Sequence, residues 1–188
     1  MGATFDADKL LKRLDALQKK YEQGAKEVEI GVTDRAIATY ATYTEFGWVQ
    51  RVTRKQKFWF IQQGVSQPPD EGASLANPPR PFLRGTLRAE GDKWMNTLAQ
   101  ALRTGRTPYD ALRITGTQAA QDVRTTIETG GTRLEKFADR APMTMELIKP
   151  SKEKTRKRKG QTDTALATRE QPLMLTGNLR RSISFQVK

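Results

Sequence analysis

Residues 81–128 read PFLRGTLRAEGDKWMNTLAQALRTGRTPYDALRITGTQAAQDVRTTIE, and they contain the two clearest helix patterns of the chain. Apolar residues recur every three or four positions, as they do on the buried face of a helix. The first helix is predicted from Pro81 or Phe82 to about Arg103, with an apolar face made of Leu83, Leu87, Trp94, Leu98, Ala101 and Leu102. The second is predicted from Pro108 to about Glu128, with a stripe made of Leu112, Ala119, Val123 and Ile127. Gly116 is expected to weaken the middle of the second helix.

Shorter elements are predicted upstream of this pair. An amphipathic helix is expected before Gly24, with a stripe made of Leu10, Leu14, Leu17 and Tyr21. Alternation of apolar with polar or small residues then predicts a short strand that contains Val28, Ile30 and Val32.

Two further helices are predicted before residue 65. One runs from the N-cap Asp34 to Phe46, ends at Gly47, and is expected to place Ile37, Tyr40, Ala41 and Thr44 on one face. Thr53 can cap a short helix that ends at Gly64 and carries Phe58, Trp59 and Ile61. Residues 48–62 are also compatible with a hairpin.

Two stretches lack such patterns. Residues 65–81 contain five prolines and are predicted to form a long loop, a feature that is often functional. Residues 149–171 are too polar to fold alone and are predicted to form a basic extended arm. Alternation returns at the end, where residues 179–187 are predicted to form a strand. The prediction is a single α+β domain over residues 1–188, in which several helices pack on a small sheet.

The 188-residue sequence contains no histidine and no cysteine. These absences exclude Ser-His-Asp and Cys-His catalysis, disulfides and the commonest metal ligands, so no metal and no cofactor are expected. Carboxylate pairs such as Glu90 with Asp92, or Asp122 with Glu128, remain, but acids on helix surfaces are far commoner than catalytic pairs. We therefore expect a protein that is not an enzyme. No apolar run approaches the roughly 18 residues of a membrane span, and no secretory signal is recognisable, which predicts a cytoplasmic protein without membrane contact.

The net charge of +12 is unevenly distributed. Residues 149–159, KPSKEKTRKRK, hold seven basic residues and one glutamate, which is half of the excess. This run is either a solvated flexible arm or a contact for DNA or an acidic partner, made by Lys152, Lys154, Arg156, Lys157, Arg158 and Lys159. Basic residues also stand beside Phe58, Trp59 and Phe60, which could stack on bases, so a basic nucleic-acid-binding protein is the alternative function.

Three short motifs stand out in order along the chain. They are YATYTEFG at residues 40–47, NPPRPFLR at 77–84, and PLMLTGNLRRSI at 172–183. Taken singly, they indicate a glycine-terminated helix, a proline-stiffened approach to a helix, and a turn before a strand. The element VTRKQKF at 52–58 lies between the first two.

Together the motifs resemble the tail-completion and neck proteins of tailed bacteriophages, also called head–tail joining or virion morphogenesis proteins, over about residues 28–187. The resemblance implies a structural virion protein of the viral tail, assembled in the host cytoplasm. It implies a homo-oligomeric ring, expected to be sixfold, that completes the tail end and joins it to the DNA-filled head. Expected partners are a head-side adaptor or stopper, a tail terminator or tail tube, and genomic DNA in the lumen. The matching structural and interface positions are Tyr40, Glu45, Phe46, Gly47, Arg80, Pro81, Phe82, Leu83, Thr176, Gly177, Leu179, Ser182 and Ile183.

Overall fold

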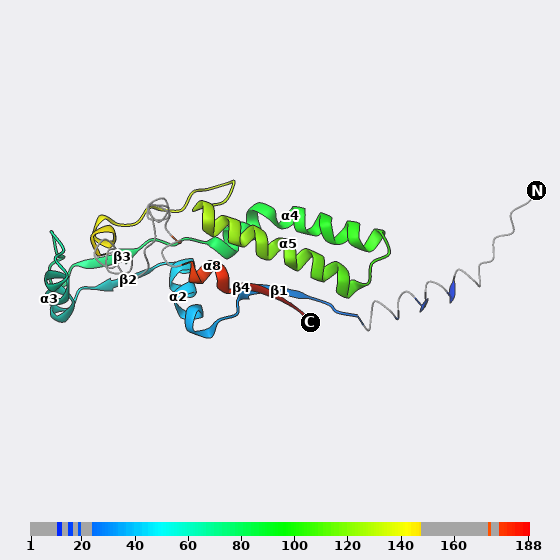
Figure 1. The fold of residues 1–188 in the computed structure, drawn as a ribbon, viewed down its shortest axis with the longest axis horizontal. Coiled ribbons are helices and arrows are strands. Elements are labelled where there is room, and N and C mark those ends of the chain that lie inside the picture. The colour runs from blue at the N-terminus through cyan, green and yellow to red at the C-terminus, as the bar shows by residue number, and fades with distance from the viewer. Residues whose placement is uncertain (1–10, 13–14, 17–18, 20–23, 148–172, 174–176) are drawn as a thin grey trace, which may run out of the picture.

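The computed structural model describes residues 11–12, 15–16, 19, 24–147, 173 and 177–188, which form an elongated molecule (Figure 1). The elements, in chain order, are β1 (Val28–Val32), α2 (Arg35–Phe46), β2 (Trp48–Arg51), α3 (Arg54–Gln62), β3 (Ser74–Asn77), α4 (Phe82–Arg103), α5 (Pro108–Thr129), α8 (Asn178–Ser182) and β4 (Ile183–Val187). The predicted α+β class is confirmed, although the strands form two separate two-stranded sheets. Most of the helix predicted before Gly24, and the whole arm predicted at 149–171, lie outside the described residues.

Helices α4 and α5 form an antiparallel hairpin, and their predicted bounds are confirmed to within one residue (Figure 1). Thr107 caps α5 with Pro108 in its first turn, and Gly130 ends it in the left-handed conformation. Polar contacts join the two helices, including the buried Thr86–Thr126 hydroxyl pair at 2.8 Å. The predicted apolar face of α4 is wrong at Leu87, which is 58% exposed because the buried face of this part of the helix is formed by Gly85, Thr86 and Ala89 instead.

Strands β1 and β4 pair antiparallel, with Val28 opposite Val187 and Val32 opposite Ile183. This sheet packs against α5 at Gly116, where an added Cβ would lie 2.5 Å from Phe185 Cδ2 and 2.7 Å from Val28 Cγ2. Gly116 therefore permits close packing, a role that helix propensity alone did not predict. The strand predicted from residue 179 begins only at Ile183, because α8 occupies the residues before it.

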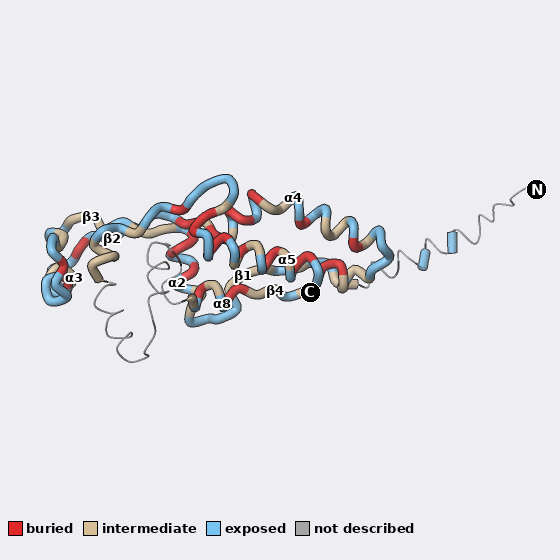
Figure 2. The backbone as a smooth tube through the Cα atoms, turned by 45° about the horizontal axis from the view of Figure 1, so that its top comes forward, coloured by how far each residue is buried: buried red, intermediate tan, exposed pale blue. Residues whose placement is uncertain are grey.

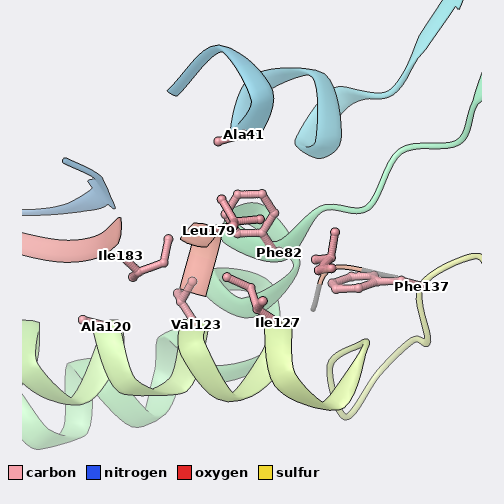
Figure 3. Close-up of a cluster of buried hydrophobic side chains, with 9 residues drawn as sticks. Ala41, Phe82, Ala120, Val123, Ile127, Phe137, Leu179 and Ile183 are labelled. Carbon is pink, nitrogen blue, oxygen red and sulfur yellow. The ribbon is translucent and has the colours of Figure 1, made fainter. Parts of the chain in front are cut away.

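The main core lies where α2, α4, α5 and α8 meet (Figure 3). Phe82, Ile127 and Ile183 are fully buried at its centre. Ala41, Ala120, Val123, Phe137, Leu173 and Leu179 complete the cluster. Residues from both ends of the described chain thus share one core, which ties the first strand, the long hairpin and the last strand together.

A smaller lobe lies at the opposite end of the molecule from the α4–α5 turn (Figure 1). Strand β2 pairs antiparallel with β3, so part of the predicted 65–81 loop is a strand instead. Helix α3 begins with a capping box between Thr53 and Gln56, as the predicted Thr53 cap required. The lobe packs around Val52, Phe60 and Val65. Figure 2 shows that much of the α3 backbone belongs to exposed residues, whereas buried residues recur along the whole length of α5 and alternate there with exposed ones.

Candidate functional site

The first two motifs meet where the carboxylate of Glu45 caps helix α4. The N-cap of α4 is Pro81, which offers no side-chain hydrogen bond. Glu45 fills this role from α2: its Oε2 accepts from the Leu83 backbone N–H at 3.0 Å, and its Oε1 accepts from the Arg84 N–H at 2.9 Å. A carboxylate at this position satisfies free amides and is favoured by the helix dipole. Glu45 is only 4% exposed, so this cap is internal to the subunit.

Arg84 reinforces the same contact. Its Nε donates to Glu45 Oε1 at 3.1 Å, and its Nη2 donates to the Glu45 backbone carbonyl at 3.1 Å. The guanidinium lies 4.2 Å from the ring centre of Phe46, a cation–π arrangement. Phe46 itself is 60% exposed, so its other face is open to contact.

Gly47 allows the two motifs to approach. Its φ of 71° lies in the left-handed region, and an added Cβ would stand 2.7 Å from the Asn77 carbonyl oxygen and 2.8 Å from the Pro79 nitrogen. Both features require glycine at this position. The Arg80 N–H also donates to the Thr44 carbonyl at 2.8 Å, which fixes the proline-rich segment against the end of α2.

Arg80 is 5% exposed and makes three side-chain hydrogen bonds. Nη1 donates to Asn77 Oδ1 at 2.8 Å, Nε to the Ala138 carbonyl at 2.9 Å, and Nη2 to the Asp139 carbonyl at 2.9 Å. Burial lowers the pKa of the Arg80 guanidinium below its usual value, against an opposing electrostatic contribution from Tyr40. The stiff guanidinium therefore ties the segment that enters α4 to the segment that follows α5.

The third motif joins the same region through the main core. Gly177, with a φ of 70°, precedes α8, and Ser182 Oγ donates to the Leu179 carbonyl at 2.8 Å. Leu179 and Ile183 are buried in the cluster that contains Phe82 and Ala41. Thr176 and the six basic arm residues lie outside the described residues.

The structure therefore brings together the matching positions from Glu45 to Gly47, from Arg80 to Leu83, and from Leu179 to Ile183. Tyr40 differs from these, because it is 52% exposed instead of lying on the buried face of α2. Sequence reasoning did not assign roles to Arg84 and Asn77, although both stand within the second motif. The contacts of Arg80 with residues 138–139 could not be predicted from the sequence, because its partners there are backbone carbonyls that any residue type would supply.

A polar cavity of about 310 Å³ lies between α4, α5 and the turn at 131–133. It contains Glu90 and Asp122, one member of each predicted carboxylate pair. Arg133 Nε lies 3.1 Å from Glu90 Oε1, and Lys93 Nζ lies 3.2 Å from Asp122 Oδ2. Asp122 Oδ2 also accepts from Trp94 Nε1 at 2.8 Å. These acids are therefore engaged in holding α4 to α5 and to the following turn.

Within the described ranges, no group of acidic side chains is arranged to hold a metal ion. None of the helices in those ranges has the length and apolar character needed to cross a membrane. Comparisons with models of known protein families, with curated proteins and with solved structures found no match.

Proposed function

We propose that this chain is a structural protein of a tailed-bacteriophage virion. In this proposal it is a subunit of the neck ring that completes the tail end and joins it to the DNA-filled head. The observation that carries the proposal is the convergence of the three motifs. Glu45 of the first motif and Arg80 of the second meet at the start of α4, where Phe82 packs in one core with Leu179 and Ile183 of the third motif. A signature made of internal contacts is typical of a shared fold and not of an active site.

Exposed aromatic residues support an assembly role. Tyr40, Tyr43 and Phe46 on α2 are 52–60% exposed and follow one another at intervals of three residues. Aromatic residues are enriched at protein interfaces because they bury large areas with few rotatable bonds. Closed rings need two different surfaces on each subunit, joined head to tail. We propose the exposed α2 face as one of these surfaces.

The first test is the amount of this chain in gradient-purified virions of its source phage, measured by mass spectrometry against the portal subunit. A fixed, low ratio that corresponds to one ring, expected to be sixfold, supports the proposal. Absence from virions with joined heads and tails contradicts it. In that case, a DNA affinity that falls steeply with salt would identify the alternative, a basic nucleic-acid-binding protein.

The ring surface is tested with the variant Tyr43→Glu. Because Tyr43 is 54% exposed, we expect a folded chain that no longer assembles when examined by native mass spectrometry. The matched control is Tyr109→Glu, which changes a tyrosine of 54% exposure at the start of α5. Equal assembly of both variants would contradict the assignment of the α2 face.

A further inference from the structure

Helix α3 exposes a more apolar surface than the one it buries. Phe60 is the buried residue of this helix, whereas Phe58, Trp59 and Ile61 are 61%, 47% and 52% exposed. These three residues form what we call the α3 patch. It lies in the lobe farthest from the turn between α4 and α5 (Figure 1). A cluster of exposed large apolar residues at the end of a molecule is typical of an interaction site.

Three cations border this patch at one end. Arg54 lies one helical turn before Phe58, Lys55 lies one turn before Trp59, and Arg51 ends the preceding strand. All three are exposed, and none forms an ion pair with another residue of the described ranges. By contrast, Lys57 is paired with Asp70, its Nζ lying 2.7 Å from Asp70 Oδ1. Within this lobe, the unpaired positive charge therefore lies at the start of α3.

The position of these charges is unfavourable for the isolated subunit. The N-terminus of a helix carries a partial positive charge, which favours acidic and disfavours basic residues in the first turn. Arg54 and Lys55 occupy that turn, and it contains no acidic residue. A negatively charged surface placed against this end would remove the conflict. A second copy of this chain, with a net charge of +12, fits the site poorly.

We propose that the α3 patch is a docking surface for a different protein. The partner would receive the patch in an apolar pocket of its own that is bordered by acidic residues. Aromatic residues at the centre with arginine at the edge match the composition of protein interfaces. A nucleic-acid site fits less well, because Ile61 cannot stack on a base and the cations lie at one end of the helix instead of along it. This inference rests on the α3 lobe alone and is independent of the phage assignment.

The test is site-specific photocrosslinking of the full chain in the cells that naturally contain it. The photoreactive residue p-benzoylphenylalanine replaces Phe58, and in the matched control it replaces Met95, which is 64% exposed on α4. We expect position 58, and not position 95, to crosslink to one other protein, at a segment rich in Asp, Glu and apolar residues. The double variant Arg54→Glu/Lys55→Glu should reduce the crosslink at least tenfold, and reversing the partner's acidic residues to lysine should restore it.

Several outcomes would overturn the proposal: a crosslink to DNA, a crosslink to a second copy, equal crosslinking at both positions, no crosslink at position 58, or no effect of the charge reversal. Folding of the double variant is checked by its unfolding midpoint. We expect this midpoint to stay the same or to rise, because the substitution places acids in the first turn of α3. Loss of the crosslink with a retained midpoint therefore reports on docking and not on folding.

Discussion

The cap that Glu45 places on α4 predicts a large effect for a single substitution. Glu45→Ala leaves the Leu83 and Arg84 N–H groups without their acceptor in a partly buried setting. Hydrogen bonds to charged groups contribute about 1.5–3 kcal/mol each. Because water can partly replace the carboxylate, we expect a total loss of about 3 kcal/mol, near the lower end for two bonds. The Arg84 ion pair adds little, since the arginine side chain is 53% exposed.

The loss is measured by urea denaturation followed by far-ultraviolet circular dichroism. A loss of this size corresponds to a fall of about 6–12 °C in Tm for a chain of this length. Glu45→Gln keeps an acceptor oxygen without the charge, so its loss of unfolding free energy should be about half that of Glu45→Ala. The control is Glu71→Ala, an exposed acid with no hydrogen bond or ion pair to the described residues. An unfolding free energy for Glu45→Ala within about 0.5 kcal/mol of the control would refute the capping role.

Four further substitutions test three other features. Gly116→Ala should destabilise the fold by about 1–2 kcal/mol, because the added Cβ would lie 2.5 Å from Phe185. Gly91→Ala, the control in α4, should stabilise the fold by about 0.5–1 kcal/mol, because the nearest atom to its added Cβ is 3.6 Å away. Equal changes in unfolding free energy for the two variants would disprove the packing argument. Arg80→Lys should cost about 2 kcal/mol or more, since an ammonium group cannot reproduce three fixed bonds, and a wild-type midpoint would contradict this. A hydrogen bond from Lys57 lowers the pKa of Asp70 below its ordinary 3.8. The Lys57–Asp70 pair therefore stabilises the fold above about pH 3.8, and this stabilisation is lost as the pH falls through the lowered pKa. Asp70→Asn should therefore give a shallower acid dependence of the unfolding midpoint, and an unchanged slope would count against it.

The sequence predicted the elements whose ends are marked by local chemistry. Asp34 and Gly47 delimit α2, and Thr107 with Gly130 delimits α5, because capping residues act within a few positions of the helix end. Strand β3 was missed because its pairing with β2 depends on residues more than 20 positions away, while the surrounding prolines favour a loop.

The side of a helix that becomes buried was harder to predict. In α3 the three consecutive residues Phe58, Trp59 and Phe60 are all aromatic, so periodicity does not indicate which one enters the core. Contacts with Val52 and Val65 select Phe60. At the motif junction, the sequence indicated the positions but not their roles. The bonds of Arg80 to carbonyls 58 and 59 residues away arise only from tertiary structure.

The pairing of β1 with β4 also orders events during synthesis. Thr33 and Ser182, which bond beside the two strands, are 149 residues apart. At about 5–20 residues per second, β1 leaves the ribosome roughly 7–30 s before its partner strand. During that interval the surface of α5 at Gly116, which Phe185 later covers, remains open in the nascent chain. The helical hairpin can form early, whereas completion of the subunit waits for the arrival of β4.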